Sequence, residues 1–100
     1  MSGIKHDKGK ARVDLVLTGF PNALMAIAEV ATFGADIHGE NTWQDLEDGE
    51  KRYMAAEGRH KLKRLTGNNI DKESGLTHQA HEVWNALAQL ELAIRRRNSI

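Results

Sequence analysis

The sequence predicts an all-α protein, a small helical bundle of about three helices that is completed by homo-oligomerisation. Apolar residues recur at helical spacing in three segments, whereas a single proline and 5% aromatic residues disfavour a β-sandwich. The last of these segments is apolar over a wider arc than one chain of 100 residues can cover. We therefore expect one helical domain over residues 1–100 that associates with further copies of itself.

Composition excludes several classes of site and partner. The chain contains no cysteine, which excludes disulfides and thiolate metal sites and fits a cytoplasmic protein. Its 14 basic and 14 acidic residues balance, so no bulk charge draws it to nucleic acid or to a membrane surface. No apolar run approaches the roughly 18 residues of a membrane span, and we expect no membrane partner.

The first part of the chain predicts an arm, a helix and a loop. Residues 1–20 begin with the polar run MSGIKHDKGKAR, and we expect an irregular N-terminal arm. The first helix should begin at Pro21, because the N–H that proline lacks would be unpaired in a first turn anyway. It continues through NALMAIAEVATF, and Gly34 can supply a left-handed stop. Residues 34–48 are rich in Gly, Asn and Asp and predict a loop.

The second helix should cover about residues 49–66 and end at Gly67. Gly58 lies in its interior, where glycine costs about 1 kcal/mol relative to alanine. Either a neighbouring helix passes very close to Gly58, or the turn serves a ligand. The apolar residues that we expect to face the core are Met54, Leu62 and Leu65.

A second loop over residues 68–76 leads to a third helix over about residues 77–97, which Thr77 or Ser74 can cap. This helix carries two stripes. The polar stripe consists of His78, His81 and Asn85, and the apolar stripe consists of Val83, Leu87, Leu90 and Ile94. At about 100° per residue the two stripes are separated by roughly half a turn, so this helix should be packed on more than one side.

The histidines are the residues most suited to chemistry. His78 and His81, at i and i+3, can converge on one metal ion, and Glu57 and His60 share this spacing on the preceding helix. Glu-x-x-His on bundle helices is a known way to build a carboxylate-rich metal site, and imidazole ligands favour Mn, Fe, Co, Ni or Zn over Mg. The structural alternative is that His78 caps its helix and His81 binds a loop carbonyl.

Other residues can contact phosphate or base, each with a plainer alternative. Arg59 suits bidentate phosphate binding, or is an exposed helical arginine. Lys10 and Arg12 lie in a segment whose composition resembles a phosphate-contacting loop, or a solvated tail. Trp43 is either a loop anchor or a base-stacking platform, and Glu29 either faces solvent or points inward as a metal ligand.

Taken together, several blocks resemble a known family. They are DKGKARVDL, AEVATFGADIHGENTWQ, RYMAAEGRH and DKESGLTHQAHEVWNAL. In this order, over about residues 5–93, they resemble the phage-associated family described as the dATP/dGTP diphosphohydrolase N-terminal domain. That family in turn resembles the all-α NTP pyrophosphohydrolases (MazG-like proteins). The resemblance implies a helical oligomer with a nucleotide partner in the cytoplasm, the host cytoplasm if the protein is phage-encoded.

The related enzymes hold a divalent metal with acidic ExxE and ExxD motifs, and this sequence departs from that pattern. It offers Glu57-x-x-His60 and His78-x-x-His81, so that only one of the four positions is acidic, whereas Mg²⁺ prefers oxygen ligands. The metal implied is Mg, Mn, Co or Zn. The positions that match the small family's own pattern are Arg59, His60, Asp71, Glu73, Ser74, Gly75, His78, His81 and Asn85.

The function implied is hydrolysis of a (deoxy)nucleoside triphosphate to the monophosphate and pyrophosphate, with a metal that bridges phosphate oxygens and activates water. The candidate metal ligands are His60, His78, His81, Glu57, Glu73 and Glu29. The candidate catalytic residues are His81, Arg59 and Asn85, and the candidate substrate contacts are Lys10, Arg12, Arg59 and Trp43. The alternative is a non-catalytic phage protein of the same fold that binds nucleotide or inhibits a host protein. Zero net charge disfavours a nucleic-acid partner.

Overall fold

The computed structural model describes residues 8–99, and this part of the chain is helical without a β-strand. Its elements in order are helix α2 (Val13–Gly19), helix α3 (Pro21–His38), the 3-10 helix η1 (Thr42–Asp45), helix α4 (Gly49–Leu65) and helix α5 (His78–Asn98). The predicted all-α class is therefore confirmed, with four α-helices over residues 8–99 in place of about three.

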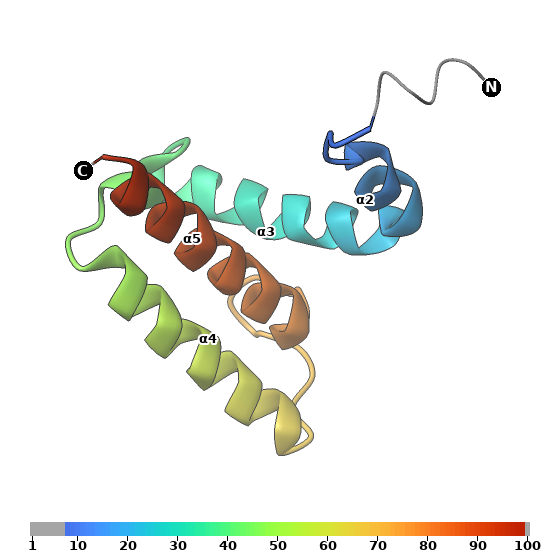
Figure 1. Ribbon diagram of the computed structural model, residues 1–100. Helices are drawn as coiled ribbons and strands as arrows, with labels where there is room; N and C mark the ends of the chain where they lie inside the picture. Colours follow the sequence, from blue (N-terminus) through green and yellow to red (C-terminus); the bar gives the residue numbers. More distant parts are fainter. Residues whose placement is uncertain (1–7, 100) are drawn as a thin grey trace.

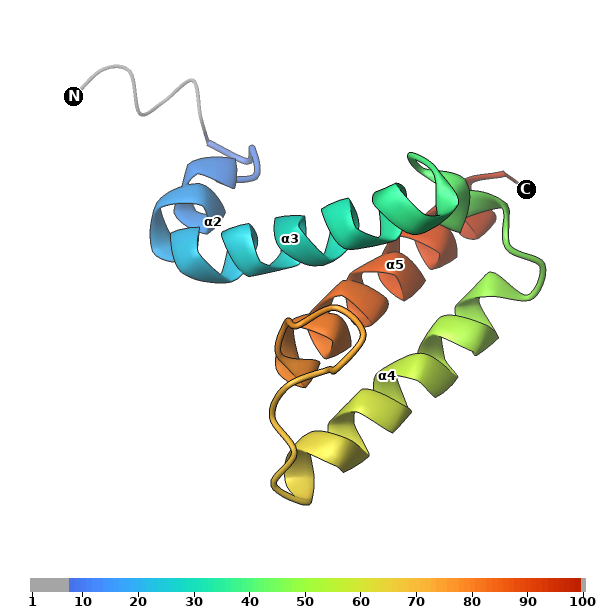
Figure 2. The same ribbon diagram turned by 180° about the vertical axis from the view of Figure 1, so that it is seen from behind.

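Helices α4 and α5 run antiparallel and form the main packed unit (Figure 1). Helix α3 crosses α5, and α2 packs at the far end of α3, away from α4 (Figure 2). The chain is extended, at 51 × 35 × 25 Å with a radius of gyration of 16.3 Å. A compact domain of 100 residues has a radius of gyration of about 13 Å, so a single chain leaves much of its helical surface uncovered.

Local sequence explains where the two central helices begin and end. Thr77 caps α5, because its hydroxyl oxygen accepts a hydrogen bond from the N–H of Ala80 at 3.1 Å. Gly67 follows α4 with a φ of 96°, a left-handed conformation that glycine adopts without steric cost. The predicted spans of 49–66 and 77–97 agree with the structure to within one residue at each end.

Two expectations for the N-terminal third are wrong. Residues 13–19 of the expected arm form α2, whose first turn carries Asp14, an acid that complements the helix dipole; residues 1–7 of the arm lie outside the described part. Helix α3 does not stop at Gly34 but continues to His38, and Gly39 supplies the positive φ of 99° that follows its end. The predicted loop over residues 34–48 is correspondingly shorter and contains η1.

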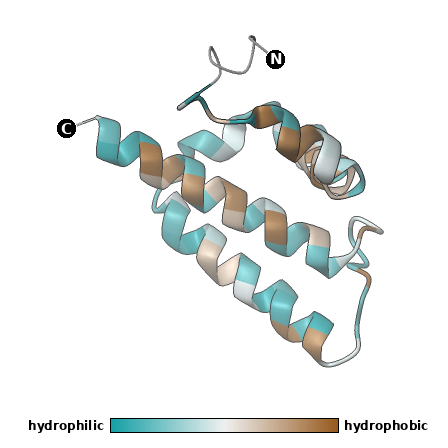
Figure 3. Ribbon diagram, turned by 45° about the vertical axis from the view of Figure 1, so that its right-hand side comes forward, coloured by the Kyte–Doolittle hydropathy of each residue, from teal (hydrophilic) through white to brown (hydrophobic). Residues whose placement is uncertain are grey.

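The packed face of α5 is polar, and its apolar stripe faces outward. Its buried polar residues are His78, His81, Glu82 and Asn85, accompanied by Ala80 and Ala88. The apolar stripe of Val83, Leu87, Leu90 and Ile94 is 36–58% exposed, and Met54, Leu62 and Leu65 of α4 are 57–66% exposed. The core face expected for α4 is therefore wrong for a single chain. Figure 3 shows apolar residues recurring along α5 and at the end of α4.

Within residues 8–99 no single helix has the length and apolar character needed to cross a membrane. Helices α2 and α3 meet that requirement only when they are taken together, and they join at an angle of 90°.

Gly58→Ala should stabilise the chain. A Cβ at Gly58 would meet no heavy atom within 4 Å, so we expect the higher helix propensity of alanine to raise the free energy of unfolding by about 0.5–1 kcal/mol. The matched control is Gly49→Ala at the buried start of α4, where a Cβ would lie 3.1 Å from Cδ1 of Leu92 and should bring no gain. Urea unfolding measures both. A loss of stability in Gly58→Ala would contradict the expectation that a Cβ fits freely at this position, and would indicate that a second chain packs against this turn.

Candidate metal centre

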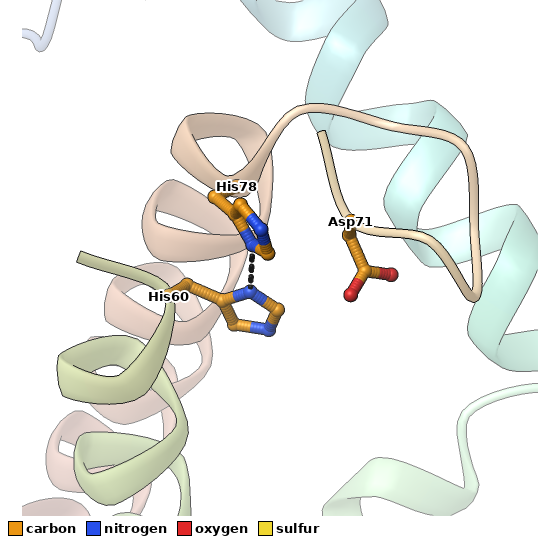
Figure 4. Close-up of side chains that lie close together, drawn as sticks. All are labelled: His60, Asp71 and His78. Atoms are coloured by element: carbon orange, nitrogen blue, oxygen red, sulfur yellow. Dashed lines mark hydrogen bonds between the residues drawn. The ribbon is translucent and has the colours of Figure 1, made fainter. Parts of the chain in front are cut away.

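Three histidines from two helices meet where α4 ends and α5 begins. The Nδ1 atom of His60, on α4, lies 2.8 Å from Nδ1 of His78, the first residue of α5 (Figure 4). The His60 ring also stacks on His81, with centroids 4.5 Å apart and planes inclined by 10°. Because the helices are antiparallel, the last turns of α4 lie beside the first turns of α5. The structure thus brings together three of the predicted site residues.

Asp71 reaches the same place from the loop between the two helices. An antiparallel bridge between Ile70 and Thr77 folds this loop back on itself. The Oδ2 atom of Asp71 accepts hydrogen bonds from the N–H of Ser74 at 3.0 Å and from its hydroxyl at 2.8 Å. Gly75 takes the positive φ of 74° that the turn requires. The turn thereby holds the carboxylate beside the histidines (Figure 4).

Asp71 is ionised at neutral pH. Burial raises the pKa of its carboxyl group, but the two hydrogen bonds from Ser74 and the nearby imidazoles of His81 and His60 outweigh burial, so that the pKa lies below its usual value. An ionised carboxylate can only accept hydrogen bonds, and this fact decides where the neighbouring protons lie.

The hydroxyl of Ser74 determines the tautomer of His81. Since Asp71 can only accept, the Ser74 proton points to Oδ2 of Asp71. The Nε2 atom of His81 lies 2.7 Å from Oγ of Ser74 and must therefore donate to it, as the N–H of Leu76 does at 3.1 Å. Ser74 thus donates one hydrogen bond and accepts two. His81 carries its proton at Nε2 and acts on Asp71 through Ser74.

The most buried side chain of the cluster has an unpaired nitrogen. His78 is 1% exposed, and its Nε2 atom has no hydrogen-bond partner among residues 8–99. Whichever of the two facing Nδ1 atoms donates, His78 Nε2 is left as an unpaired buried donor or acceptor, at a cost of about 1–3 kcal/mol. Buried polar atoms are normally paired, so one left over calls for a water molecule or an ion.

The ligand atoms are spaced for one divalent cation. One ligand atom from each of His60, Asp71 and His78 lies within 4.8 Å of the other two. The Nδ1 atoms of His60 and His78 are 2.8 Å apart. Two nitrogen ligands, each about 2.0–2.1 Å from one metal and forming a right angle at it, would be about 2.9 Å apart. The arrangement therefore fits a metal ion bound between α4, the loop and α5.

The protonation states also fit metal binding. Burial lowers the pKa of His60, and the positive charge that His81 would carry lowers it further. Burial likewise lowers the pKa of His81. Metal ligands must be neutral imidazoles and ionised carboxylates, and the folded chain favours these forms for His60 and Asp71. Two nitrogen donors and one oxygen suit Mn, Co or Zn better than Mg.

Two other predicted residues support the helices beside the cluster. The carboxylate of Glu57, one turn before His60, accepts a hydrogen bond from Nε2 of Gln89 at 2.8 Å. The buried amide of Asn85 donates to the backbone carbonyl of His81 at 2.8 Å. Neither side chain belongs to the converging ligand group within the described residues. The Glu57 contact joins α4 to α5, and the Asn85 contact stabilises α5 itself.

The remaining predicted residues lie apart from the ligand group. Those with exposed side chains are Lys10, Arg12, Glu29, Arg59 and Glu73. Arg12, the residue before α2, pairs with Asp14 of that helix at 2.8 Å. Trp43 packs edge-to-face against Tyr53 and Trp84, with centroids 6.4 and 5.9 Å away, and so anchors the loop before α4.

Sequence reasoning missed Asp71 as a candidate ligand and missed a partly buried ion pair. The pattern D-x-x-S-G is typical of a turn in which an aspartate binds the backbone two or three residues ahead. Asp71 lies seven positions before His78, so the sequence contained a signal that could have placed it near the histidines. Arg64 forms a bidentate pair with Glu82, at 2.6 and 2.9 Å. The hydrogen bonds from Arg64 hold the pKa of Glu82 below its usual value.

The chain is similar in sequence to a described family and to a phage protein. The family described as "dATP/dGTP diphosphohydrolase, N-terminal" matches residues 1–99. A protein of Salmonella phage PMBT28 named dATP/dGTP diphosphohydrolase is 37% identical over 81 residues, which are 81% of this chain and 26% of the relative. This chain therefore spans about a quarter of that relative's length. No solved structure matches the chain.

Acidification should destabilise the metal-free chain. The folded pKa values of His60 and His81 lie below 6.5, so below about pH 6.5 the unfolded chain binds more protons and the free energy of unfolding falls. The loss should level off once the pH is below the folded values. We expect Tm, measured with a chelator between about pH 7.5 and 5, to decrease, because unfolded histidines protonate over this range.

The matched variants for this measurement are His60→Asn, which should flatten the pH dependence, and His38→Asn, which changes an exposed histidine at the end of α3 and should leave it intact. A native Tm that does not change over this range would contradict the burial of neutral imidazoles.

Proposed function

Because the chain belongs to the family described as dATP/dGTP diphosphohydrolase, N-terminal, we propose that it takes part in the metal-dependent hydrolysis of a purine deoxynucleoside triphosphate to the monophosphate and pyrophosphate. The observation that carries the proposal is the convergence of His60, Asp71 and His78 beside an unpaired buried nitrogen. The name of the phage relative supports the substrate class. We expect the host cytoplasm as the compartment, because that relative is a phage protein.

Each residue has a distinct role in this proposal. His60, His78 and Asp71 would hold the cation, which when bound neutralises phosphate charge and lowers the pKa of a bound water. His81 is a positioning residue, because its Nε2–H orients Ser74, which in turn holds Asp71. Asn85 supports the backbone of His81. The exposed cations Arg59, Lys10 and Arg12 stay candidate phosphate contacts.

The competing function is nucleotide or host-protein binding without hydrolysis. It is favoured by the single acid in the ligand group and by the length of the relative, of which this chain covers about a quarter. The kinship with MazG-like enzymes stays a prediction. Metal analysis and a hydrolysis assay on the same preparation separate the two functions.

Loss of a ligand should abolish turnover. The chain is incubated with each of the four deoxynucleoside triphosphates and with Mg, Mn, Co or Zn, and pyrophosphate is measured. His78→Ala and Asp71→Asn should each lower the rate at least about 100-fold, since even indirect supports of a metal commonly contribute 10–100-fold. Arg97→Ala, at the exposed end of α5, is the control and should keep the native rate. Full turnover in His78→Ala would refute the metal centre, whereas metal binding without pyrophosphate release would favour the competing function.

We further propose that a second copy covers the exposed apolar faces. The chain exposes 7833 Å², whereas a folded monomer of 11.1 kDa exposes about 5,700 Å². The surplus exceeds the roughly 800 Å² that each partner contributes to a standard interface. Identical chains with such a surplus most simply pair with each other.

Leu87→Glu should weaken this association. Leu87 lies in the middle of the apolar stripe of α5 and is half exposed, and a buried unpaired charge at an interface is costly. Sedimentation at micromolar concentration should give a dimer or larger for the native chain and a smaller species for Leu87→Glu. Asn68→Glu, in the exposed loop after α4, adds the same charge and should leave the native state unchanged. A native monomer at that concentration would overturn the proposal.

A further inference from the structure

A cavity of about 740 Å³ opens between α3, η1 and the first half of α4, against Trp84 of α5. This volume lies within the roughly 300–1,000 Å³ typical of small-molecule sites. The rings of Trp43, Tyr53 and Trp84 form its aromatic wall, and Asp45 and Arg52 supply charged groups. The metal centre does not use any of these residues.

The aromatic wall is rigid without a ligand. The three rings contact one another edge-to-face, with centroids 5.5–6.4 Å apart. The hydroxyl of Tyr53 donates to the backbone carbonyl of Trp43 at 2.6 Å. Arg95, which does not line the cavity, lies 5.8 Å over the Trp43 ring and donates to Oε1 of Gln44 at 2.5 Å. The wall is thus preorganised, which lowers the cost of ordering it on binding.

The opposite wall is built from small residues of α3. Ala31, Gly34 and Ala35 line the cavity, and a Cβ at Gly34 would meet no heavy atom within 4 Å. A larger side chain at position 34 would therefore enter the cavity without a clash at its Cβ. At these three positions α3 presents little bulk to the cavity, whereas Thr32 and His38 of the same helix also line it.

The cavity and the metal centre lie along one face of the α4–α5 pair. Tyr53 and His60 are seven residues apart on α4, which is about two turns and about 10 Å of helix. Trp84 and His81 are one turn apart on α5. Phe33 of α3 touches His81 edge-to-face at 6.3 Å, and its neighbour Gly34 lines the cavity. A ligand seated in the cavity can therefore extend toward His60.

We propose that this cavity binds the base of a purine nucleotide. Base–aromatic stacking contributes about 1–3 kcal/mol per base, and a purine presents a larger face than a pyrimidine. The carboxylate of Asp45 can accept from ring N–H and amino groups, and the guanidinium of Arg52 can donate to a purine oxygen or nitrogen. The inference rests on the proposed function, in that the phosphates of the same ligand lead to the metal centre.

Tryptophan fluorescence reports on this cavity directly, because both tryptophans of the chain line it. The native chain is titrated with deoxyguanosine and deoxyadenosine, which lack phosphate and so need no metal, and with deoxycytidine and thymidine. We expect saturable quenching by the purine nucleosides, with at least about tenfold higher affinity than for the pyrimidine nucleosides. Absence of saturable quenching by either purine nucleoside, or equal affinity for all four nucleosides, would overturn the proposal.

Two substitutions locate the binding. Gly34→Leu should fill the cavity and lower purine affinity at least about tenfold, whereas Gly34→Ala, the matched control, should keep it; circular dichroism checks that both fold. Asp45→Asn on η1 tests the polar contact without changing α3 and should lower the affinity at least about fivefold. Native affinity in both Gly34→Leu and Asp45→Asn would refute this location.

His78→Ala separates this inference from the proposed function. It should keep nucleoside quenching while it loses pyrophosphate release. Purine binding in a chain that hydrolyses no triphosphate would support the cavity and count against the hydrolytic function. Hydrolysis of a triphosphate without any quenching by purine nucleosides would support the hydrolytic function and refute the purine site in the cavity.

Discussion

The contact between His60 and His78 is the constraint on which the α4–α5 pair depends. The two helices close over polar side chains where helix pairs usually close over apolar ones, and the buried residues His81, Glu82 and Asn85 extend this polar interior. Each buried polar group is costly without a partner, so the few arrangements that pair them are strongly preferred. A polar network specifies one register and one helix orientation when its groups are paired, and among the described buried side-chain atoms His78 Nε2 is the one without a partner. The side chains that hold the fold together are therefore the same ones that form the candidate site.

Because the interior between α4 and α5 is polar, the hydrophobic contribution to the stability of the fold must come from other surfaces. Among the described residues, the buried apolar side chains are Val30, Ala80 and Ala88, too few to offset the conformational entropy of a chain of this length. The outward stripe of α5 and the apolar end of α4 offer the missing area. If a second copy covers that stripe, as proposed, α5 is fixed from both sides, which accounts for its two opposed stripes. Assembly and site geometry would then be coupled through one helix.

The helices that form the site could be predicted from sequence, and their inward faces could not. Capping and glycine signals located α4 and α5 to within a residue, and the spacing of the histidines placed them on one face. Periodicity alone assigns apolar residues to the core, and it fails here because a single chain leaves the apolar stripe of α5 exposed. Gly34 illustrates the limit of local signals, since α3 continues through it to His38 despite the small cost of glycine in a helix. Asp71 was missed because its role depends on a fold-back of the loop, a non-local event.

The segment from Asp71 to His81 supplies most of the residues of the candidate site. Asp71 supplies the one carboxylate, Ser74 and Gly75 shape the turn that presents it, and His81 holds Ser74 through its Nε2–H. One ligand thus comes from the loop and two come from the helices on either side of it. Since the unfolded chain has no such preformed site, metal binding here would stabilise the folded state by linkage. It would also join the loop to both helices, since the three candidate ligands come from α4, the loop and α5. The stability of the loop and the competence of the site would accordingly rise together.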